Sequence, residues 1–255
     1  LPIADIETKH LVALLTPIWN TKTETAAKLR QRIEAIIDSA TVEGYSSSAN
    51  PARWRGHLSH LLPNPHKIKR VIHYPSMPFE ALPAFVTALR QREALSARLM
   101  EFVVLTACRQ SEVRLATHDE IDRTNRIWTI PASRMKTNRE HRVPLTDRML
   151  EIIDECETDS HYLFAEKESA LSINALRMLM NRMGVGEYTP HGFRSSFRTW
   201  GAERGDFDSE ALEVALAHYS SSSVVSAYRR TDFMEERKCI LNRWQCYLLM
   251  TQNVK

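Results

Sequence analysis

The sequence predicts a mainly α-helical protein with one small antiparallel β-sheet. The 255 residues include only seven glycines and are rich in Leu, Ala, Arg and Glu, residues typical of helices. Apolar residues recur at helical spacing along most of the chain, and only the segments 126–131 and 140–145 have the pattern of short strands. A chain of this length can form one or two domains with a sizeable core.

The first part of the chain predicts a small helical domain over residues 1–62. Leu11–Leu15 has the pattern of a short helix that stops at Pro17. The spacing of residues 21–24 is that of a capping box, and it precedes an apolar face at helical period that continues to Ala40.

Positive charge is concentrated between Gly44 and Phe79, a stretch without any Asp or Glu. The net charge is only +3, so affinity for nucleic acid would have to come from such local patches. Four prolines place a basic linker at 63–78. Each basic side chain here could be a solvated surface charge or a phosphate contact. With flanking basic residues, the predicted DNA contacts are Lys28, Arg30, Arg53, Arg55, Lys67, Lys69, Arg70, Arg134 and Arg139.

The remainder, residues 79–255, predicts a second domain of helices around the two strands. The strands flank a basic turn over 133–139. The last helix carries an apolar stripe that either packs on its own domain or mediates assembly with a neighbouring copy. The expected helices are 79–89, 94–108, 111–116, 147–156, 171–183, 208–218 and 233–249, with a further one beginning at His191.

Several classes of protein are disfavoured by composition. No apolar run approaches membrane-spanning length. The four cysteines show no metal-binding spacing and no signal peptide precedes them, which favours the reducing cytoplasm. No carboxylate cluster suggests a metal site, and we expect no cofactor. The chain opens at Leu1 rather than Met, which indicates a fragment that begins inside a domain.

Six residues, in order along the chain, form a candidate site for phosphodiester chemistry without a metal. Such a reaction needs a nucleophile, cations on the non-bridging oxygens, a base, and an acid for the leaving oxygen. Any one of the six is more often structural than catalytic, but their combination and order argue against chance. The candidate catalytic residues are Arg109, Lys136, His191, Arg194, His218 and Tyr228.

Each candidate suits one part of that reaction. Tyr228 can form a reversible phosphoester, and the planar guanidinium groups of two arginines can clamp two oxygens. The histidines can hydrogen-bond the phosphate or handle protons near neutral pH, and Lys136 can protonate the leaving oxygen. Glu112, three residues after Arg109, is expected to be its structural partner across one helical turn.

The chain resembles the tyrosine recombinases, and among them the phage and prophage integrases of the P4-like group. The similarity extends over essentially the whole sequence. The motifs that carry it are Leu105–Val113, Trp128–Pro131 with Arg134–Lys136, His191–Arg194, Leu216–His218, Ala227–Arg230, Asn50–Trp54, and Glu235–Arg237 through Trp244.

The resemblance implies a fold, an activity and partners. The fold would be a helical core-binding domain and a mixed α/β catalytic domain that form a clamp on DNA. Arg109, His191, Arg194 and His218 would activate the scissile phosphate, Lys136 would assist the leaving group, and Tyr228 would attack it. The product would be a 3′-phosphotyrosine with a free 5′-hydroxyl.

Further properties follow from the same resemblance. The partners would be double-stranded DNA at an attachment-site core, a homotetramer on that DNA, and candidate excisionase and host DNA-bending proteins. The protein would be bacterial and prophage-encoded. The core-binding domain would lack its first helix, and the amino-terminal arm-binding domain typical of such integrases would be absent.

Two other functions remain open on the sequence. A type IB topoisomerase uses the same chemistry but acts as a monomer, so synapsis of two specific sites would distinguish it. A DNA-binding remnant without catalysis belongs to a different class. The presence of all six candidate residues argues against such a remnant.

Overall fold

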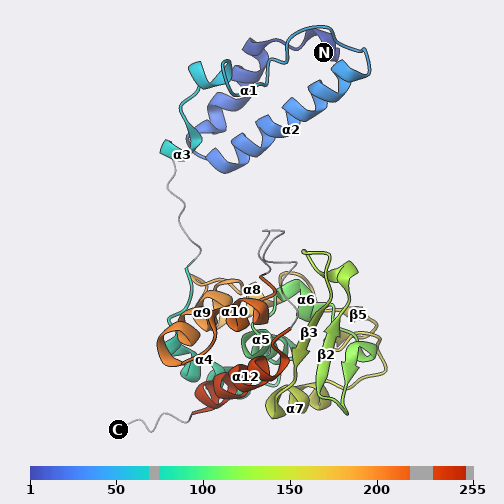
Figure 1. Cartoon of the computed structure of the whole chain (residues 1–255), viewed down its shortest axis with the longest axis vertical. Coiled ribbons are helices and arrows are strands. Elements are labelled where there is room, and N and C mark those ends of the chain that lie inside the picture. The colour runs from blue at the N-terminus through green and yellow to red at the C-terminus, as the bar shows by residue number, and fades with distance from the viewer. Residues whose placement is uncertain (69–74, 219–231, 251–255) are drawn as a thin grey trace. The chain divides into compact units, whose positions relative to one another are not determined.

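The computed structural model describes residues 1–68, 75–218 and 232–250 (Figure 1). The chain divides into two compact units, Leu1–His73 and Tyr74–Lys255. Both are mainly helical, and the described strands form small antiparallel sheets, which confirms the predicted fold class. In the part of the chain that the structure describes, every helix is too short or too polar to cross a membrane.

The first unit is built on two packed helices. Its core joins apolar residues of both helices to the segment that follows them, including Ala52, Leu58 and Leu62. Its described elements are η1 (Ile3–Asp5), α1 (Thr8–Trp19), α2 (Thr23–Val42), η2 (Leu58–His60) and α3 (Pro65–Ile68). Ile68, on α3, packs against this core.

Helix α1 is longer than the sequence predicted. Pro17 lies inside it, and the helix continues to Trp19. Proline removes one backbone donor, but Trp19 is buried, stacks on Trp54 at a centroid distance of 5.7 Å, and donates its indole N–H to the Pro63 carbonyl at 2.9 Å. These contacts stabilise the last turn, so the expected stop at Pro17 is wrong.

The predicted capping box at the start of α2 is also wrong. The N-cap residue is Lys22, and no side chain caps the helix. The backbone N–H of Lys22 instead donates to the Ile18 carbonyl at 2.8 Å, which continues the tight turn out of α1. The Glu24 carboxylate lies 2.6 Å from the Lys28 ammonium, one turn further along α2.

In the second unit, one buried helix lies at the centre and several other helices pack around it. Helix α5 packs on α4, α6, α7, α8 and α12, and every residue from Leu99 to Thr106 is buried. The described helical elements are η3 (Phe79–Ala81), α4 (Leu82–Arg90), α5 (Leu95–Thr106), α6 (Gln110–Arg114), η4 (His118–Glu120), η5 (Ala132–Arg134), α7 (Asp147–Glu155), α8 (Ala175–Arg182), α9 (Gly192–Arg204), α10 (Ser209–Ala215) and α12 (Met234–Leu249).

Two sheets complete the second unit. The first has the order β1-β2-β3, with strands Ile121–Asp122, Ile127–Ile130 and His141–Pro144, all antiparallel. Its last two strands are the two that the sequence predicted. The second is a short hairpin of β4 (Ala165–Glu166) and β5 (Ser169–Ala170), which the sequence did not predict.

Helix α12 packs on its own unit. Its apolar side chains Ile240, Leu241, Trp244 and Leu248 lie in the core that also contains α5, and the helix contacts α4, α5, α10 and β3. The Trp244 indole N–H donates to the Val104 carbonyl at 2.9 Å, in the last turn of α5. Of the two roles that the apolar stripe allowed, the structure therefore shows packing within the same chain.

The first described residues of the second unit lie against the start of α9. A methyl group in place of the hydrogen on Gly192 would come within 2.8 Å of the Pro75 carbonyl oxygen and 2.9 Å of the Ser76 Cα atom. The Ser196 hydroxyl donates to the Met77 carbonyl at 2.5 Å, and Met77 is buried in the core. Residues 75–77 therefore form an entry segment that is fixed to α9.

Candidate functional site

Arg109 is placed by the end of α5 and the start of α6. Ala107 ends α5 in the left-handed conformation (φ 52°), which turns the chain so that Arg109 becomes the N-cap residue of α6. The buried Glu112 carboxylate accepts from the backbone N–H and from Nη1 of Arg109, both at 2.7 Å. The expected pairing of Glu112 with Arg109 is confirmed.

Arg194, on the first turn of α9, is 4% exposed and joins two other elements. Its Nη1 donates to the Ala107 carbonyl and its Nη2 to the Leu216 carbonyl, both at 2.5 Å. Burial lowers the pKa of this guanidinium from its ordinary value, although the group stays charged in any physiological range. Its Nε is buried and has no hydrogen-bond partner among the described residues. The end of α5 and the end of α10 are thus both fixed to one cation.

His218 follows the end of α10 and faces the same cation. Its Nε2 lies 3.1 Å from Nη2 of Arg194, and its Nδ1 lies 2.9 Å from a carboxylate oxygen of Glu213. The sequence predicted a helix up to His218, but α10 ends at Ala215 because Ala217 adopts the left-handed conformation (φ 50°). This turn directs His218 back toward the helix.

His191 is the N-cap residue of α9, and its surroundings bring the candidate residues together. Desolvation lowers the pKa of its imidazole most, and the positive charges of Arg194, Arg109, His218 and Lys136 lower it further. Four cationic or ionisable nitrogen groups from four segments of the chain are therefore close enough to lower the pKa of the His191 imidazole.

Lys136 is exposed on the connection between β2 and β3, next to the buried Met135. The sixth candidate, Tyr228, lies outside the described residues, as do Lys69 and Arg70. Cys108, next to Arg109, is fully buried and burial raises the pKa of its thiol to about 12. It is therefore a protonated thiol and an inert group beside the site.

The geometry suits an anion with several oxygens. Two guanidinium groups, a lysine and two imidazoles converge from α6, the β2–β3 connection, α9 and the end of α10, and the backbone N–H groups at the start of α9 add to the positive potential. Within the described residues, no group of three or more His, Cys, Asp or Glu side chains could hold a metal ion.

Two of the predicted DNA contacts have side chains that already bond to groups within the protein. Arg30 is 7% exposed, donates to the Ala52 carbonyl at 2.7 Å, and pairs with Glu34 at 2.5 Å. Arg134 donates to the Leu115 and Glu112 carbonyls and pairs with Glu120 at 3.2 Å.

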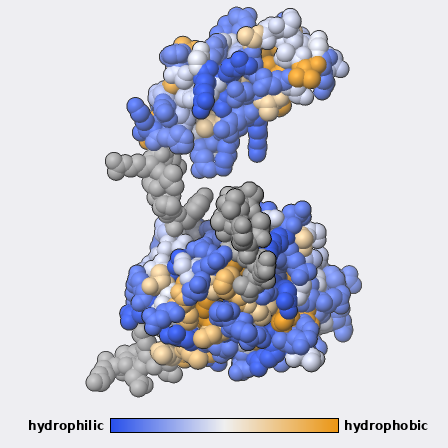
Figure 2. Space-filling model, viewed as in Figure 1, coloured by the Kyte–Doolittle hydropathy of each residue, from blue (hydrophilic) through white to orange (hydrophobic). Residues whose placement is uncertain are grey.

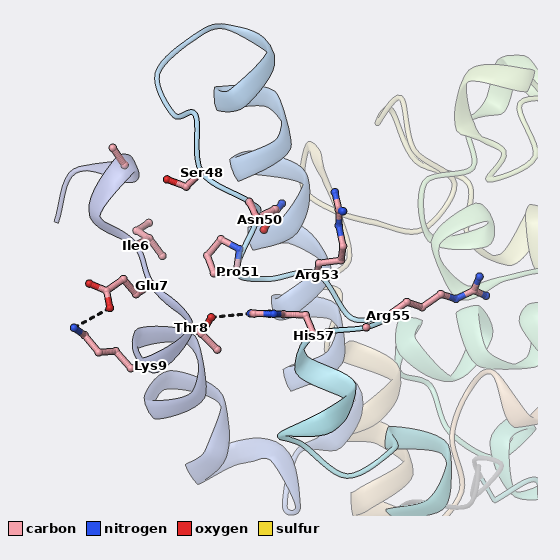
Figure 3. A pocket seen from close by; sticks show the side chains of 13 residues that line it. Ile6, Glu7, Thr8, Lys9, Ser48, Asn50, Pro51, Arg53, Arg55 and His57 are labelled. Carbon is pink, nitrogen blue, oxygen red and sulfur yellow. Dashed lines mark hydrogen bonds and ion pairs between the residues drawn. The ribbon is translucent and has the colours of Figure 1, made fainter.

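The other described residues of that set lie at the surface. Arg53 and Arg55 line a pocket of about 590 Å³ in the first unit, together with Lys9 and His57. Figure 3 shows Arg55 pointing away from Glu7 and Lys9, which lie across the pocket. Most of the visible surface of this unit is hydrophilic (Figure 2). The remaining exposed residues of the set are Lys28, Lys67 and Arg139.

Three residues around the site were not predicted from the sequence. Glu213 and Arg198 form an ion pair at 2.6 Å beside His218. His141, on β3, is buried and hydrogen-bonds the backbone of Ala215. Burial, followed by the charges of Arg237 and other arginines, lowers its pKa to about 3, so it is neutral. Of these three, only Glu213 could have been suspected from the sequence, because it lies five residues before His218.

Two family models match the chain. The model of the phage integrase family matches residues 76–235, and the model of the phage integrase central domain matches residues 1–57. The integrase of Enterobacteria phage P4 is 29% identical over 98% of this chain and 61% of its own length. The prophage integrase IntS of Escherichia coli K12 is 30% identical over 97% and 65%. The chain thus spans about three fifths of these relatives.

Solved structures show the same fold. A lambda integrase (75–356) dimer bound to a core site superposes with a TM-score of 0.64 at 19% identity, covering 87% of this chain and 82% of that one. A lambda integrase tetramer bound to a Holliday junction gives 0.64 at 18% identity, covering 86% and 66%. At such identities the likeness is one of fold.

Proposed function

The chain belongs to the phage integrase family, and from that membership we propose that it is a site-specific DNA recombinase. It would cleave and rejoin DNA strands through a 3′-phosphotyrosine intermediate and so integrate or excise a mobile element. The observation that carries the proposal is that Arg194 bonds both the end of α5, two residues before Arg109, and the His218 imidazole. Residues 1–62 would be the core-binding domain, 63–78 the linker and 79–255 the catalytic domain.

In the proposed reaction the Tyr228 oxygen attacks the scissile phosphorus. A phosphorus–oxygen bond to tyrosine forms while the bond to the 5′-oxygen breaks, so no bond energy is lost to water. Arg109 and Arg194 would bind the two non-bridging oxygens, since their charges stabilise the pentacoordinate transition state. Their fixed partners support this role, because a preorganised cation needs no reorganisation during the reaction.

The proton steps fall to the remaining residues. His191, whose pKa is lowered, is largely neutral at physiological pH and could accept the tyrosine proton. Lys136, exposed on the β2–β3 connection, would give a proton to the departing 5′-oxygen. His218, whose Nε2 contacts Nη2 of Arg194, would act on the phosphate through that guanidinium.

The partners belong to the same proposal. We expect double-stranded DNA at an attachment-site core, a homotetramer on that DNA, candidate excisionase and host DNA-bending partners, and a bacterial cytoplasmic location. Solved relatives bound to a core site and to a Holliday junction support the DNA substrate and the tetramer.

Covalent capture tests the proposed activity. The chain is mixed with a pool of nicked duplexes with a randomised core, in which cleavage releases a short fragment and traps the adduct. We expect adducts that survive SDS and disappear with protease, enriched in one core sequence. Tyr228→Phe should bind that sequence as tightly as the parent and form no adduct. Adducts in the Tyr228→Phe variant would contradict the assignment of the nucleophile.

The same sequence separates the alternatives. A recombinase should join two duplexes that carry the selected core, whereas a type IB topoisomerase would relax supercoiled DNA without synapsis. A non-catalytic DNA-binding protein would enrich a sequence in a binding assay and give no adduct with the parent chain.

A further inference from the structure

We propose that Glu213 is a positioning residue that fixes the orientation and the tautomer of His218, and that Arg198 holds Glu213 in place. The inference rests on the proposed function, because it concerns a histidine that we place at the scissile phosphate. It arises from three sets of contacts around the end of α10.

The backbone first brings Glu213 and His218 together. The N–H of His218 donates to the Glu213 carbonyl, and the N–H of Ala217 donates to the Val214 carbonyl, both at 2.9 Å. With Ala217 in the left-handed conformation, these two bonds form a Schellman motif. In a helix continued through residue 218, the histidine would lie about 140° around the axis from Glu213 and would face away from it.

The side-chain contacts then specify one tautomer of the imidazole. The Glu213 carboxylate can only accept, so Nδ1, at 2.9 Å, must carry a hydrogen. The Arg194 guanidinium can only donate, so Nε2, at 3.1 Å, must offer its lone pair. Both neighbours therefore select the neutral Nδ1–H form and aim Nε2 at the cation that we place on the phosphate.

Arg198 connects this carboxylate to the helix that carries Arg194. Its Nε donates to the second Glu213 oxygen at 2.6 Å, and its Nη2 to the Ser209 hydroxyl at 3.0 Å. Burial alone would raise the pKa of Glu213, but the hydrogen bonds from Arg198 and His218 outweigh it and lower that pKa. The carboxylate is thus ionised at neutral pH. Both partners of the His218 imidazole are therefore held by α9, since Arg194 lies on it and Glu213 is bonded by its Arg198.

A purely structural role makes a different prediction. The side chains of Arg198 and Glu213 are 31% and 37% exposed, and ion pairs at such sites contribute little to stability. If Glu213 served only the fold, its replacement would leave the site intact at temperatures below unfolding. A positioning role instead changes the imidazole and the cleavage rate in a folded protein.

The test compares Glu213→Gln with Glu203→Gln, an equal change of charge at an exposed position of α9. The amide of Gln can donate as well as accept, so it no longer selects one tautomer. Adduct formation on the selected nicked core should slow at least about tenfold. The loss should be smaller than the loss caused by removing a fully buried carboxylate that orients a catalytic histidine, because water reaches the pair of Glu213 and His218. DNA affinity should be unchanged, and Glu203→Gln should match the parent in both.

The second readout is the nitrogen NMR spectrum of the free, ¹⁵N-histidine-labelled chain, assigned by loss of the His218 signals in His218→Asn. The parent should show the Nδ1–H form, and Glu213→Gln a mixture of both tautomers. An unchanged cleavage rate, or an unchanged tautomer, overturns the proposal. Absence of any adduct from the parent would instead contradict the proposed recombinase activity, and the spectrum would still decide whether Glu213 controls His218.

Discussion

Lys136 lies on the connection between two paired strands, where its exposed ammonium group can move without disturbing the core. The proposed acid role predicts its response to the leaving group. Lys136→Ala should slow cleavage of ordinary DNA about 100-fold, a typical contribution of a general acid. With sulfur at the 5′-bridging position, departure as a thiolate needs no proton, so most of that rate should return.

A surface lysine serves as the control. Lys238→Ala, on α12, removes the same charge and should leave both substrates unaffected. If Lys136→Ala is equally slow on oxygen and sulfur substrates, Lys136 contacts a phosphate and is not the acid.

His141 predicts a pH dependence of stability. Its pKa is about 3 in the folded chain and near 6.5 when unfolded, so the unfolded state binds more protons between these values. Its contribution is complete above pH 6.5 and falls with decreasing pH, by about 1.4 kcal/mol per unit. His141→Gln keeps a donor for the Ala215 carbonyl but cannot titrate.

The measurement is urea unfolding of parent and variant at matched pH values from 7.5 to 5. The difference between the two free energies should shift in favour of the variant as pH falls, since all other titrations cancel. A constant difference over this range would show that His141 titrates normally.

Residue chemistry was more predictable from the sequence than residue environment. The motif order named five described residues that the structure brings near one another. It could not show that Arg30 and Arg134 are bound by backbone carbonyls from distant segments. Glu213 was missed because its meeting with His218 depends on a left-handed alanine, a conformation that sequence suggests only for glycine.

Among the elements, helices with a clear apolar period were predictable, while their ends depended on tertiary contacts. The stop expected at Pro17 is overcome by the burial of Trp19. The hairpin of β4 and β5 has two residues in each strand, too few for any alternation to show in the sequence.

Helix α12 leads to a prediction at this scale. The buried Trp244 contacts Trp200 at a ring-centroid distance of 4.8 Å and is hydrogen-bonded to α5. Trp244→Ala should lower the free energy of unfolding by about 3–5 kcal/mol through the cavity it leaves. Because these contacts lie within one chain, thermal unfolding should not depend on protein concentration.

Asn242→Ala, at an exposed position of the same helix, is the matched control and should change stability by less than about 0.5 kcal/mol. A Trp244→Ala chain of parental stability that fails only to assemble on DNA would instead show that α12 docks on a neighbouring copy.

For the whole molecule, the modest net charge of +3 makes the location of charge decisive. Arg53, Arg55 and Lys67 lie at the surface of the first unit, in the stretch without acids. Replacing all three by Ala should reduce the slope of log K against log salt by about three units if each contacts a phosphate.

The control triple Arg123, Arg126 and Lys238 to Ala makes the same change in net charge, at residues paired with acids in the second unit. Its slope should equal that of the parent. Equal slopes for all three proteins would mean that Arg53, Arg55 and Lys67 face only solvent.

The entry segment at residues 75–77 determines where the second unit can be fused to the amino-terminal unit of another protein. It lies against Gly192, next to His191, so a graft made there would replace residues that contact the start of α9. A foreign amino-terminal unit should therefore be fused before Pro75, leaving that segment with its own α9. Whether such a hybrid gains a new DNA specificity and keeps its catalytic site should therefore depend on the residue at which the two units are joined.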